Sequence, residues 1–354
     1  MRVVIAMSGG VDSSVAASLL VEAGHEVIGL SMQLYDQRAG GETFGSCCSI
    51  DDLYDARRVA DTLGIPHYIV NFEQRFRETV VDNFVREYAA GRTPIPCVHC
   101  NADLKFATLA ERAAGLDAAA VATGHYARVR YDEDCRRYRL LRGADPDKDQ
   151  SYFLFSLTQD QLAHAMFPVG HLSKPQVRAH AARLRLSVAE KPDSHEICFV
   201  PDGETADFVE RHLATTPPTG DMVDSSGRVV GQHRGLHRYT VGQRRGLGIS
   251  TAAPMYVLKL EPAESRLVIG PREELGRQDL TASGVNWIDG RTPATPRRVT
   301  ARIRHHHPDA PGTVVPDGPD SVTVRFDAPQ LAVAPGQAIV FYEGENVLGG
   351  GWID

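Results

Sequence analysis

The chain has 354 residues, a formal net charge of −7 at neutral pH, 42% hydrophobic residues and 23% charged residues. This length exceeds the usual size of one hydrophobic core, so we expect two or three domains, and the composition excludes extended disorder. The sequence has neither a signal-peptide pattern nor a run of about 20 apolar residues, so we expect a cytoplasmic protein without a membrane partner.

The first 124 residues alternate between strand and helix patterns. Apolar runs predict buried strands at 2–7, 25–32, 65–72 and 118–124. Helical patterns lie between them, at 13–24 with Gly24 as its stop, at 51–64 behind a capping box of Ser49 and Asp52, and near 74–90 and 101–114. This alternation implies a parallel sheet flanked by helices, with right-handed crossovers.

Further elements complete the first domain and change character after it. Residues 126–142 predict a hairpin, and helical patterns follow near 158–165 and 174–185. From about residue 215 the chain contains short β-type runs between turn residues, which predict antiparallel structure and a small barrel. We therefore expect three domains: an α/β domain over 1–200, a small β-rich domain over 201–277 and a β-barrel over 278–354.

The negative net charge argues against a nucleic-acid partner, which requires clustered lysine and arginine. Local patches matter more than the sum, and two basic stretches occur, at 233–248 and 297–307. On composition alone, a solvated face is the better explanation of each stretch. The histidine triplet 305–307 does not predict a metal site, because adjacent side chains on a strand point in different directions.

A glycine-rich loop, Ser8 to Ser13, lies between the first strand and the first helix. Glycine lets backbone amides approach an anion, and the helix N-terminus adds partial positive charge. The loop lacks the lysine of a Walker A motif and the spacing of a dinucleotide fingerprint. Its sequence, SGGVDSS, resembles the PP-loop of ATP pyrophosphatases, which implies an adenine nucleotide alpha hydrolase-like fold and cleavage of ATP to AMP and pyrophosphate.

Three cysteines lie in informative surroundings. Cys97 and Cys100 occupy a proline-rich loop between two predicted helices, and Cys100 abuts the second helix, whose N-terminus would stabilise a thiolate. Cys198 lies in an apolar run, where a lone cysteine is more often a core residue than a catalyst. Cys47, Cys48 and Cys135 are interpreted as packing or incidental surface thiols.

These segments together resemble the tRNA-specific 2-thiouridylase family (MnmA/TrmU) over most of the chain. The motifs that carry the resemblance are SGGVDSS, PIPCVHCNADLKF, ATGHYARV, DKDQSYFL, KPDSHEICFV, YTVGQRRGLGI and PGQAIVFYEGENVLGGGWI, in this order. The resemblance implies an enzyme that thiolates the 2-position of the wobble uridine. It also implies tRNAs of the Lys, Glu and Gln type, bound at the anticodon stem-loop, and a sulfur-donor protein such as a cysteine desulfurase or a relay protein.

The resemblance implies a reaction and a set of residues. ATP adenylates the uracil 2-carbonyl oxygen, Cys198 carries sulfur as a persulfide, and Cys100 either releases sulfide or resolves the persulfide as a Cys100–Cys198 disulfide bond. Asp12 helps place Mg²⁺. The implied ATP-binding residues are Ala6, Met7, Ser8, Gly9, Gly10, Val11, Asp12, Ser13, Met32 and Gly124.

Residues expected to contact tRNA come from several segments of the chain. His125 would stack on or bond the flipped uridine, Lys148 would contact phosphate, and Asp149 and Gln150 would read base edges. The full implied set is Ile95, Pro96, Cys97, His125, Lys148, Asp149, Gln150, Arg304, His305 and Gln337.

Cys97 is a departure from the family, because many members have an aspartate at this position. The role of that aspartate is therefore in doubt here. Cys97, Cys100 and Cys198 could instead hold a [4Fe–4S] cluster with one open iron, and zinc is a further alternative with weaker support. We favour persulfide chemistry and leave the cluster as an alternative.

Two other classes of protein compete with this interpretation. A PP-loop ligase or amidotransferase acting on a small molecule would leave the paired cysteines unused, and we find no glutaminase-like module. A non-catalytic RNA-binding or metal-storage protein would leave the PP-loop unexplained.

Overall fold

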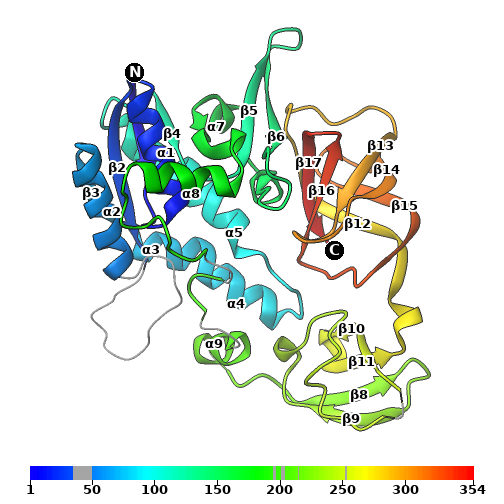
Figure 1. The fold of residues 1–354 in the computed structure, drawn as a ribbon. Helices are drawn as coiled ribbons and strands as arrows, with labels where there is room; N and C mark the ends of the chain where they lie inside the picture. Colours follow the sequence, from blue (N-terminus) through cyan, green and yellow to red (C-terminus); the bar gives the residue numbers. More distant parts are fainter. Residues whose placement is uncertain (35–49, 194–196, 201–203, 214, 252) are drawn as a thin grey trace.

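The computed structural model describes residues 1–354 apart from 35–49, 194–196, 201–203, 214 and 252. The chain forms three sheets (Figure 1), and the barrel sheet also takes in a hairpin from the first 200 residues. The Ser49 part of the expected capping box, and Cys47 and Cys48, lie outside the described residues. None of the helices in the described part is long and apolar enough to cross a membrane.

The first sheet is parallel and has the strand order β3-β2-β1-β4-β7. Its strands are β1 (Arg2–Ala6), β2 (Glu26–Gln33), β3 (His67–Asn71), β4 (Ala120–Ala122) and β7 (Ala165–Met166). Three helices contribute to the core cluster on one face of this sheet: α1 (Val11–Glu22), α2 (Ile50–Leu63) and α8 (Lys174–Arg183). The remaining helices of the first 200 residues are α3 (Glu73–Phe76), α4 (Asp82–Ala89), α5 (Pro96–His99), α6 (Leu109–Ala114) and α7 (Gln159–Ala163), with π-helical segments at Arg77–Val81 and Cys100–Thr108.

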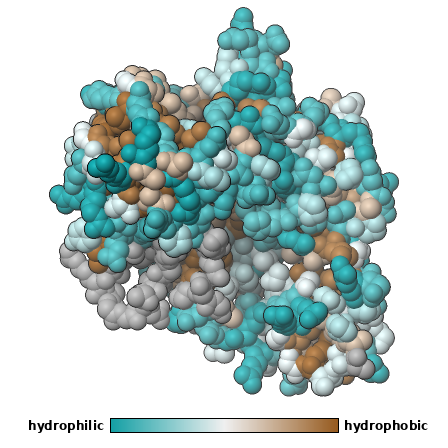
Figure 2. Space-filling view, in the orientation of Figure 1, coloured by the Kyte–Doolittle hydropathy of each residue, from teal (hydrophilic) through white to brown (hydrophobic). Residues whose placement is uncertain are grey.

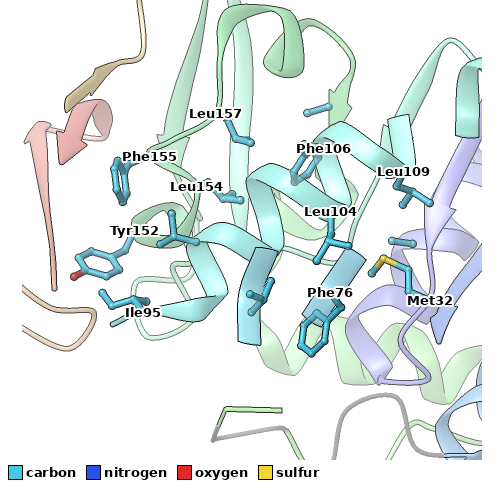
Figure 3. Packing of buried hydrophobic residues seen from close by; sticks show 14 of the residues in the cluster. Met32, Phe76, Ile95, Leu104, Phe106, Leu109, Tyr152, Leu154, Phe155 and Leu157 are labelled. Carbon is cyan, nitrogen blue, oxygen red and sulfur yellow. The ribbon is translucent and has the colours of Figure 1, made fainter. Parts of the chain in front are cut away.

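Strand β1 is buried on both faces, as a central parallel strand should be. Its alternate residues enter two different cores: Val3 and Ile5 pack in the cluster beneath α1, and Val4 packs in the larger cluster on the opposite face. Figure 3 shows part of that larger cluster, where Met32, Phe76 and Leu104 approach one another from three elements. The sheet thus has a hydrophobic layer on each side, and β1 is fixed between them.

One strand of this domain was not predicted, and the predicted hairpin pairs with another sheet. The expected helix near 158–165 ends at Ala163, and the next two residues form β7, which pairs with β4 at the edge of the sheet. A two-residue strand carries too little sequence pattern to be recognised. The predicted hairpin, β5 (Ala127–Asp132) and β6 (Arg137–Arg142), is confirmed, but it extends the barrel sheet through pairing of β6 with β17.

The second sheet has the order β10-β11-β8-β9 and its own small core. Its strands are β8 (Gly220–Asp224), β9 (Val229–His233), β10 (Tyr256–Glu261) and β11 (Arg266–Gly270). Helix α9 (Thr205–His212) precedes it and was not predicted. Phe208 and Val209 of α9 pack into the core of the first domain, so that distant core selects this short helix.

The C-terminal strands close into a six-stranded antiparallel barrel. They are β12 (Gly276–Trp287), β13 (Arg297–Arg302), β14 (Ala310–Pro316), β15 (Val322–Leu331), β16 (Ala338–Glu343) and β17 (Asn346–Ile353). Pairing of β12 with both β15 and β17 closes the ring. Figure 1 shows the barrel beside the first domain, with the β5–β6 hairpin rising between them, and Figure 2 shows a mostly hydrophilic surface over that hairpin.

Candidate active site

The glycine-rich loop lies where the order of the parallel sheet reverses. β1 has β2 on one side and β4 on the other, so the chain segments that follow β1 and β4 meet at one edge of the sheet. These segments carry Ser8–Ser13 and Gly124. Ligands of open α/β sheets bind in the crevice at such a switch point.

Two positions in this crevice require glycine because a Cβ would collide with the neighbouring backbone. Gly9 adopts φ +73°, and a Cβ there would lie 2.1 Å from the Asp52 carbonyl oxygen. A Cβ on Gly124 would lie 2.6 Å from the backbone nitrogen of Ser13. The end of β4 therefore touches the start of α1, and the loop is fixed from both sides by backbone contacts.

The N-terminus of α1 is suited to an anion. Gly10 is the N-cap residue of α1. Glycine has no side chain that could accept a hydrogen bond from the amides of the first turn. Ser13 Oγ accepts from Ser8 N at 3.2 Å and donates to Gly10 O at 3.1 Å, which folds the loop around these amides. Uncapped amides at a helix N-terminus bind phosphate oxygens.

Asp12, in the first turn of α1, has a cation beside it. Lys174 Nζ lies 2.7 and 2.9 Å from its two carboxylate oxygens, and the Tyr126 hydroxyl donates to Oδ1 at 2.7 Å. Burial, and then the negative charge of Asp12, raise the pKa of Tyr126, so Tyr126 stays a hydrogen-bond donor. Sequence reasoning missed Lys174, although a lysine in the first turn of a Ser-capped helix opposes the helix dipole and signals an acidic partner.

Asp193 joins the same network from the segment that leads to Cys198. Its carboxylate contacts Lys174 at 2.7 Å, Lys148 at 2.8 Å and Arg178 at 3.2 Å. Burial opposes its ionisation, but hydrogen bonds from Lys148 and Lys174 outweigh it and lower the pKa of Asp193 to about 2. Asp193 is therefore ionised at neutral pH and fastens this segment to the PP-loop.

Lys191 makes a second fastening between the same two segments. Its Nζ donates to Gly9 O at 3.0 Å and to the carboxylates of Asp52 at 2.5 Å and Asp55 at 2.6 Å. The residues before Cys198 are thus held to the glycine loop at two points, Lys191 and Asp193. Neither residue was singled out from the sequence.

The cysteine segment 97–100 is helical, and its prediction as a loop is wrong. Pro96 opens α5 as its first residue, and the chain continues without a break into the π-helical segment Cys100–Thr108. Because the helix begins at Pro96, Cys97 lies in its first turn and Cys100 is one turn further on. The expected helix N-terminus at Cys100 does not exist, since proline here starts a helix rather than preventing one.

Cys100 and Cys198 face the same hydrophobic cluster. Both are half-buried and pack against the larger core of the first domain, whereas Cys97 is exposed. Phe199 anchors the second cysteine through ring contacts with Phe76 at 5.4 Å and Phe84 at 5.2 Å. Among the described residues no disulfide bond is formed, so the expected Cys100–Cys198 bond is not supported as a resting feature.

The described residues contain no group of three or more His, Cys, Asp and Glu side chains that could hold a metal ion. Cys97, Cys100 and Cys198 are all described, so they do not form a ligand set in this structure.

The residues expected to contact tRNA fall into two groups, and the barrel takes part in both. His305 Nε2 lies 3.2 Å from Asp149 O, which places 148–150 beside the barrel. Gln337 Nε2 donates to Thr93 O at 2.9 Å, which places the barrel beside Ile95, Pro96 and Cys97. Arg304 is exposed, whereas Ile95 and Pro96 are buried.

Asp149 is buried, with its side chain 1% exposed. Its Oδ1 accepts from the backbone nitrogens of Gly143 and Ser151, both at 3.1 Å, and Arg142 and Arg302 lie 3.6 and 3.4 Å from Oδ2. These contacts occupy the carboxylate, which leaves it no free edge to read a base. In this structure Asp149 joins the first domain to the barrel.

His125 is largely enclosed by Phe106, Phe167 and Thr123, whose hydroxyl lies 2.7 Å from its Nδ1. Burial, and then the charge of Lys105, hold the pKa of His125 well below its usual value, so it is neutral at physiological pH.

Met32 is 8% exposed and packs in the larger core cluster at the end of β2. Gln150 Oε1 accepts from Tyr126 N at 3.0 Å.

The two basic stretches differ in what they leave accessible. In 297–307, Arg297, Arg298 and Arg302 pair with Glu343, Asp327 and Asp309. In 233–248, Arg238 pairs with Glu210, and Arg234, Arg244 and Arg245 are exposed. Acidic partners on the barrel explain why its arginines do not make it strongly basic.

Three family descriptions match the chain in succession. The tRNA methyl transferase HUP domain matches residues 1–202, the tRNA methyl transferase PRC-barrel domain matches 206–271, and the aminomethyltransferase beta-barrel domain matches 277–353. These matches agree with the α/β, β-rich and barrel architecture described above.

Full-length relatives are also found. The chain is 53% identical to a tRNA-specific 2-thiouridylase MnmA from Geotalea uraniireducens, over all of this chain and 95% of the relative. It is 51% identical to the protein of the same name from Solibacter usitatus, over 99% of each chain. Among solved structures, NMN synthetase from Francisella tularensis is 21% identical with a TM-score of 0.33, over 54% of this chain and 65% of that one.

Proposed function

This chain belongs to the tRNA-specific 2-thiouridylase (MnmA) family, and we propose that it thiolates the wobble uridine by adenylation at the Ser8–Ser13 loop followed by sulfur transfer through Cys198 and Cys100. The family membership makes the chain an ATP-using sulfurtransferase that acts on tRNA. The assignment of individual residues, the position of the uridine and the order of the two steps are the proposal.

The adenylation step joins the uracil 2-oxygen to the α-phosphorus of ATP. The bond from that phosphorus to the pyrophosphate breaks, and N3 of the base loses its proton. The uncapped amides of α1 and the Ser8 and Ser13 hydroxyls receive the departing phosphates, and Lys174 adds positive charge at Asp12. Mg²⁺ would be held here by the Asp12 carboxylate together with phosphate oxygens, in competition with Lys174, whose Nζ lies 2.7 and 2.9 Å from the two Asp12 oxygens.

The sulfur-transfer step forms one carbon–sulfur bond and breaks one carbon–oxygen bond. The terminal sulfur of the Cys198 persulfide attacks C2, and AMP leaves with the former carbonyl oxygen. The Cys100 thiolate then attacks the Cys198 sulfur, so that the electron pair of the broken S–S bond stays on the thiouridine, and N3 regains a proton. Alternatively, Cys100 first displaces sulfide, which attacks C2. Both routes leave a Cys100–Cys198 disulfide, which an external dithiol reduces with two electrons.

The iron–sulfur alternative receives no support from the positions of the three cysteines. Cys97 is exposed, and Cys97, Cys100 and Cys198 form no metal-holding group. Many members of the family have an aspartate at the position of Cys97.

The RNA-binding surface that we propose runs from the first domain to the barrel. Lys148, Gln150 and His125 lie on the first domain, and Arg304, His305 and Gln337 lie on the barrel. Exposed Arg244 and Arg245 of the middle domain add positive charge. The anticodon stem-loop of Lys, Glu and Gln type tRNAs and a sulfur-donor protein are the partners that this surface would serve. We keep 1–200, 201–277 and 278–354 as the proposed catalytic, central and tRNA-binding domains.

One observation carries the proposal: the segment that ends at Cys198 is tied to the glycine loop by Lys191 and by Asp193 through Lys174. A thiol that must meet an adenylated base has to be connected to the adenylation site. Cys198→Ala should therefore abolish thiolation of bulk tRNA, while tRNA-dependent pyrophosphate release from ATP persists within about threefold of wild type.

The matched control is Cys135→Ala, which removes a half-buried thiol on the β5–β6 turn and should leave both activities unchanged. Thiolation is measured by incorporation of labelled sulfur into tRNA, and adenylation by pyrophosphate release from the same samples. Normal thiolation by Cys198→Ala would contradict the proposed mechanism.

A further inference from the structure

His99, the last residue of α5 and the neighbour of Cys100, lies flat against a tryptophan of the barrel. The ring centroids of His99 and Trp352 are 5.0 Å apart and the planes differ by 5°. His99 Nδ1 also lies 3.3 Å from Asp103 Oδ2, four residues further along the helical segment. The histidine adjacent to Cys100 is therefore held by contacts both within its own segment and from the last strand of the chain.

The residues before α5 are held by the same barrel. Thr93 N donates to Pro335 O at 2.8 Å, and Gln337 Nε2 donates to Thr93 O at 2.9 Å. The turn at Gly336 has φ +84°, and a Cβ there would lie 2.9 Å from Arg92 Cβ. Segment 92–99 thus rests on the barrel at its beginning and at its end.

Trp352 lies on a strand of the barrel and makes both of its ring contacts with the first domain. It stacks on His99, meets the Phe155 ring at 5.8 Å, and packs against the large core cluster, which both domains share. Trp287, the other tryptophan of the chain, is 6% exposed, packs in the core of the barrel and stacks on Phe341. Substitution of Trp352 therefore tests the docking of the barrel on the first domain, and substitution of Trp287 tests the internal stability of the barrel.

The contacts with the barrel add to the stability of α5, the first turn of a longer helical stretch. Helix α5 has four residues and continues into π-helical turns, which are weak structures on their own. A stacked aromatic pair contributes about 0.5–1.5 kcal/mol beyond its buried area, and a hydrogen bond contributes about 1 kcal/mol. Such contacts are large enough to select one orientation of a single helical turn.

We propose that Trp352 and Gln337 are positioning residues for the sulfur-transfer step, because they fix the helical turn that carries Cys100. The proposal rests on the role of Cys100 proposed above. The barrel that holds the RNA then also orients the Cys100 thiol, so that one domain fixes the positions of both the uracil base and the thiol. A displacement of about 1 Å in such a frame reduces the rate about 100-fold.

The test compares Trp352→Ala with Trp352→Phe and Trp287→Phe in single-turnover assays at saturating tRNA. Trp352→Ala should slow thiolation roughly 10- to 100-fold, with pyrophosphate release and tRNA affinity within about twofold of wild type. Trp352→Phe keeps an aromatic face for His99 and should recover thiolation to within about threefold. Trp287→Phe should lower the melting temperature without changing the ratio of the two activities.

Two further readouts report on the thiol itself. The rate–pH profile of Cys100 alkylation, followed by mass spectrometry, should change in Trp352→Ala and stay the same in Trp287→Phe. Since Trp287→Phe leaves Trp352 as the single tryptophan, replacing His99 by Ala in that background should change its fluorescence emission.

Equal loss of adenylation and sulfur transfer in Trp352→Ala, or unchanged sulfur transfer, would overturn the positioning role. Cys100→Ala is measured in parallel. If it still thiolates tRNA, the proposed role of Cys100 fails and the positioning role fails with it. If Cys100→Ala is inactive while Trp352→Ala transfers sulfur normally, only the positioning role fails.

Discussion

The nucleotide half and the thiol half of the active site are built in different ways. The nucleotide half is one contiguous strand, loop and helix, whose shape depends on contacts within Ser8–Ser13 and on the close approach of Gly124. The thiol half consists of Cys100 on a short helical turn and Cys198 in a separate segment, each held by distant residues.

This difference indicates how the two chemistries depend on the fold. An anion site needs a glycine loop and a helix N-terminus, which a short sequence supplies by itself. A pair of reacting thiols needs two segments to meet, and their meeting depends on ion pairs and on the docking of another domain. Damage to the nucleotide half should stop both steps, and damage to the thiol half should stop only sulfur transfer.

Gly124→Ala should produce the largest effect and break the nucleotide half alone. The new Cβ would lie 2.6 Å from Ser13 N and 2.8 Å from the Asp12 carbonyl carbon, so the start of α1 must move. We expect pyrophosphate release and thiolation to fall together, by about 100-fold, and stability to fall by about 1–3 kcal/mol. Gly115→Ala, at an uncrowded helix end, is the control; a loss confined to thiolation would contradict the division between the halves.

Lys174→Met should affect both halves, because Lys174 lies between Asp12 of the loop and Asp193 of the Cys198 segment. Removing the ammonium leaves two carboxylates facing each other, and we expect a loss of roughly 2 kcal/mol, between the values for exposed and buried pairs. Both activities should fall about tenfold. Lys259→Met, which breaks an exposed pair with Glu261, should change stability by less than about 0.5 kcal/mol in urea unfolding.

His125 gives the smallest effect, a pH dependence of stability. Its pKa is depressed by burial in the folded state and is about 6.5 in the unfolded state, so the folded protein resists protonation. Above pH 6.5 both states are neutral and stability is at its full value. Below pH 6.5 the unfolded state takes up the proton, and stability falls by about 1.4 kcal/mol per pH unit until the folded pKa is reached.

Urea unfolding at pH 7.5, 6.5 and 5.5 measures that contribution. His125→Asn should reduce the slope between pH 6.5 and 5.5, and His171→Asn, at an exposed position, should retain the wild-type slope. A wild-type slope in His125→Asn would show that the enclosure of His125 does not disfavour its charge.

The elements with strong periodicity were predictable, and the short ones were not. β1, α1, β2 and α2 follow from apolar runs and glycine stops, because their cores lie directly above and below them. α5, β7 and α9 were missed or misassigned. Each is two to eight residues long and is selected by packing on a distant surface rather than by its own sequence.

The candidate site shows the same division. The loop Ser8–Ser13, Gly124 and the two cysteines could be named from sequence because their residue types and positions carry chemical meaning. Lys174, Lys191 and Asp193 could not, because charged residues are common and only their distances reveal a network. Asp149, which its motif predicts to contact tRNA, has a carboxylate buried between two arginines and two backbone amides, and its contact with tRNA stays a prediction.

The sequence by itself determined the family, the order of the three structural units and the anion-binding loop, since each depends on local pattern and motif order. The tertiary structure alone decided which cations hold the Cys198 segment to that loop and which tryptophan supports the Cys100 helix. Residues hundreds of positions apart meet through packing and electrostatics that no local pattern encodes, because the free energy of each contact exists only once the domains have docked.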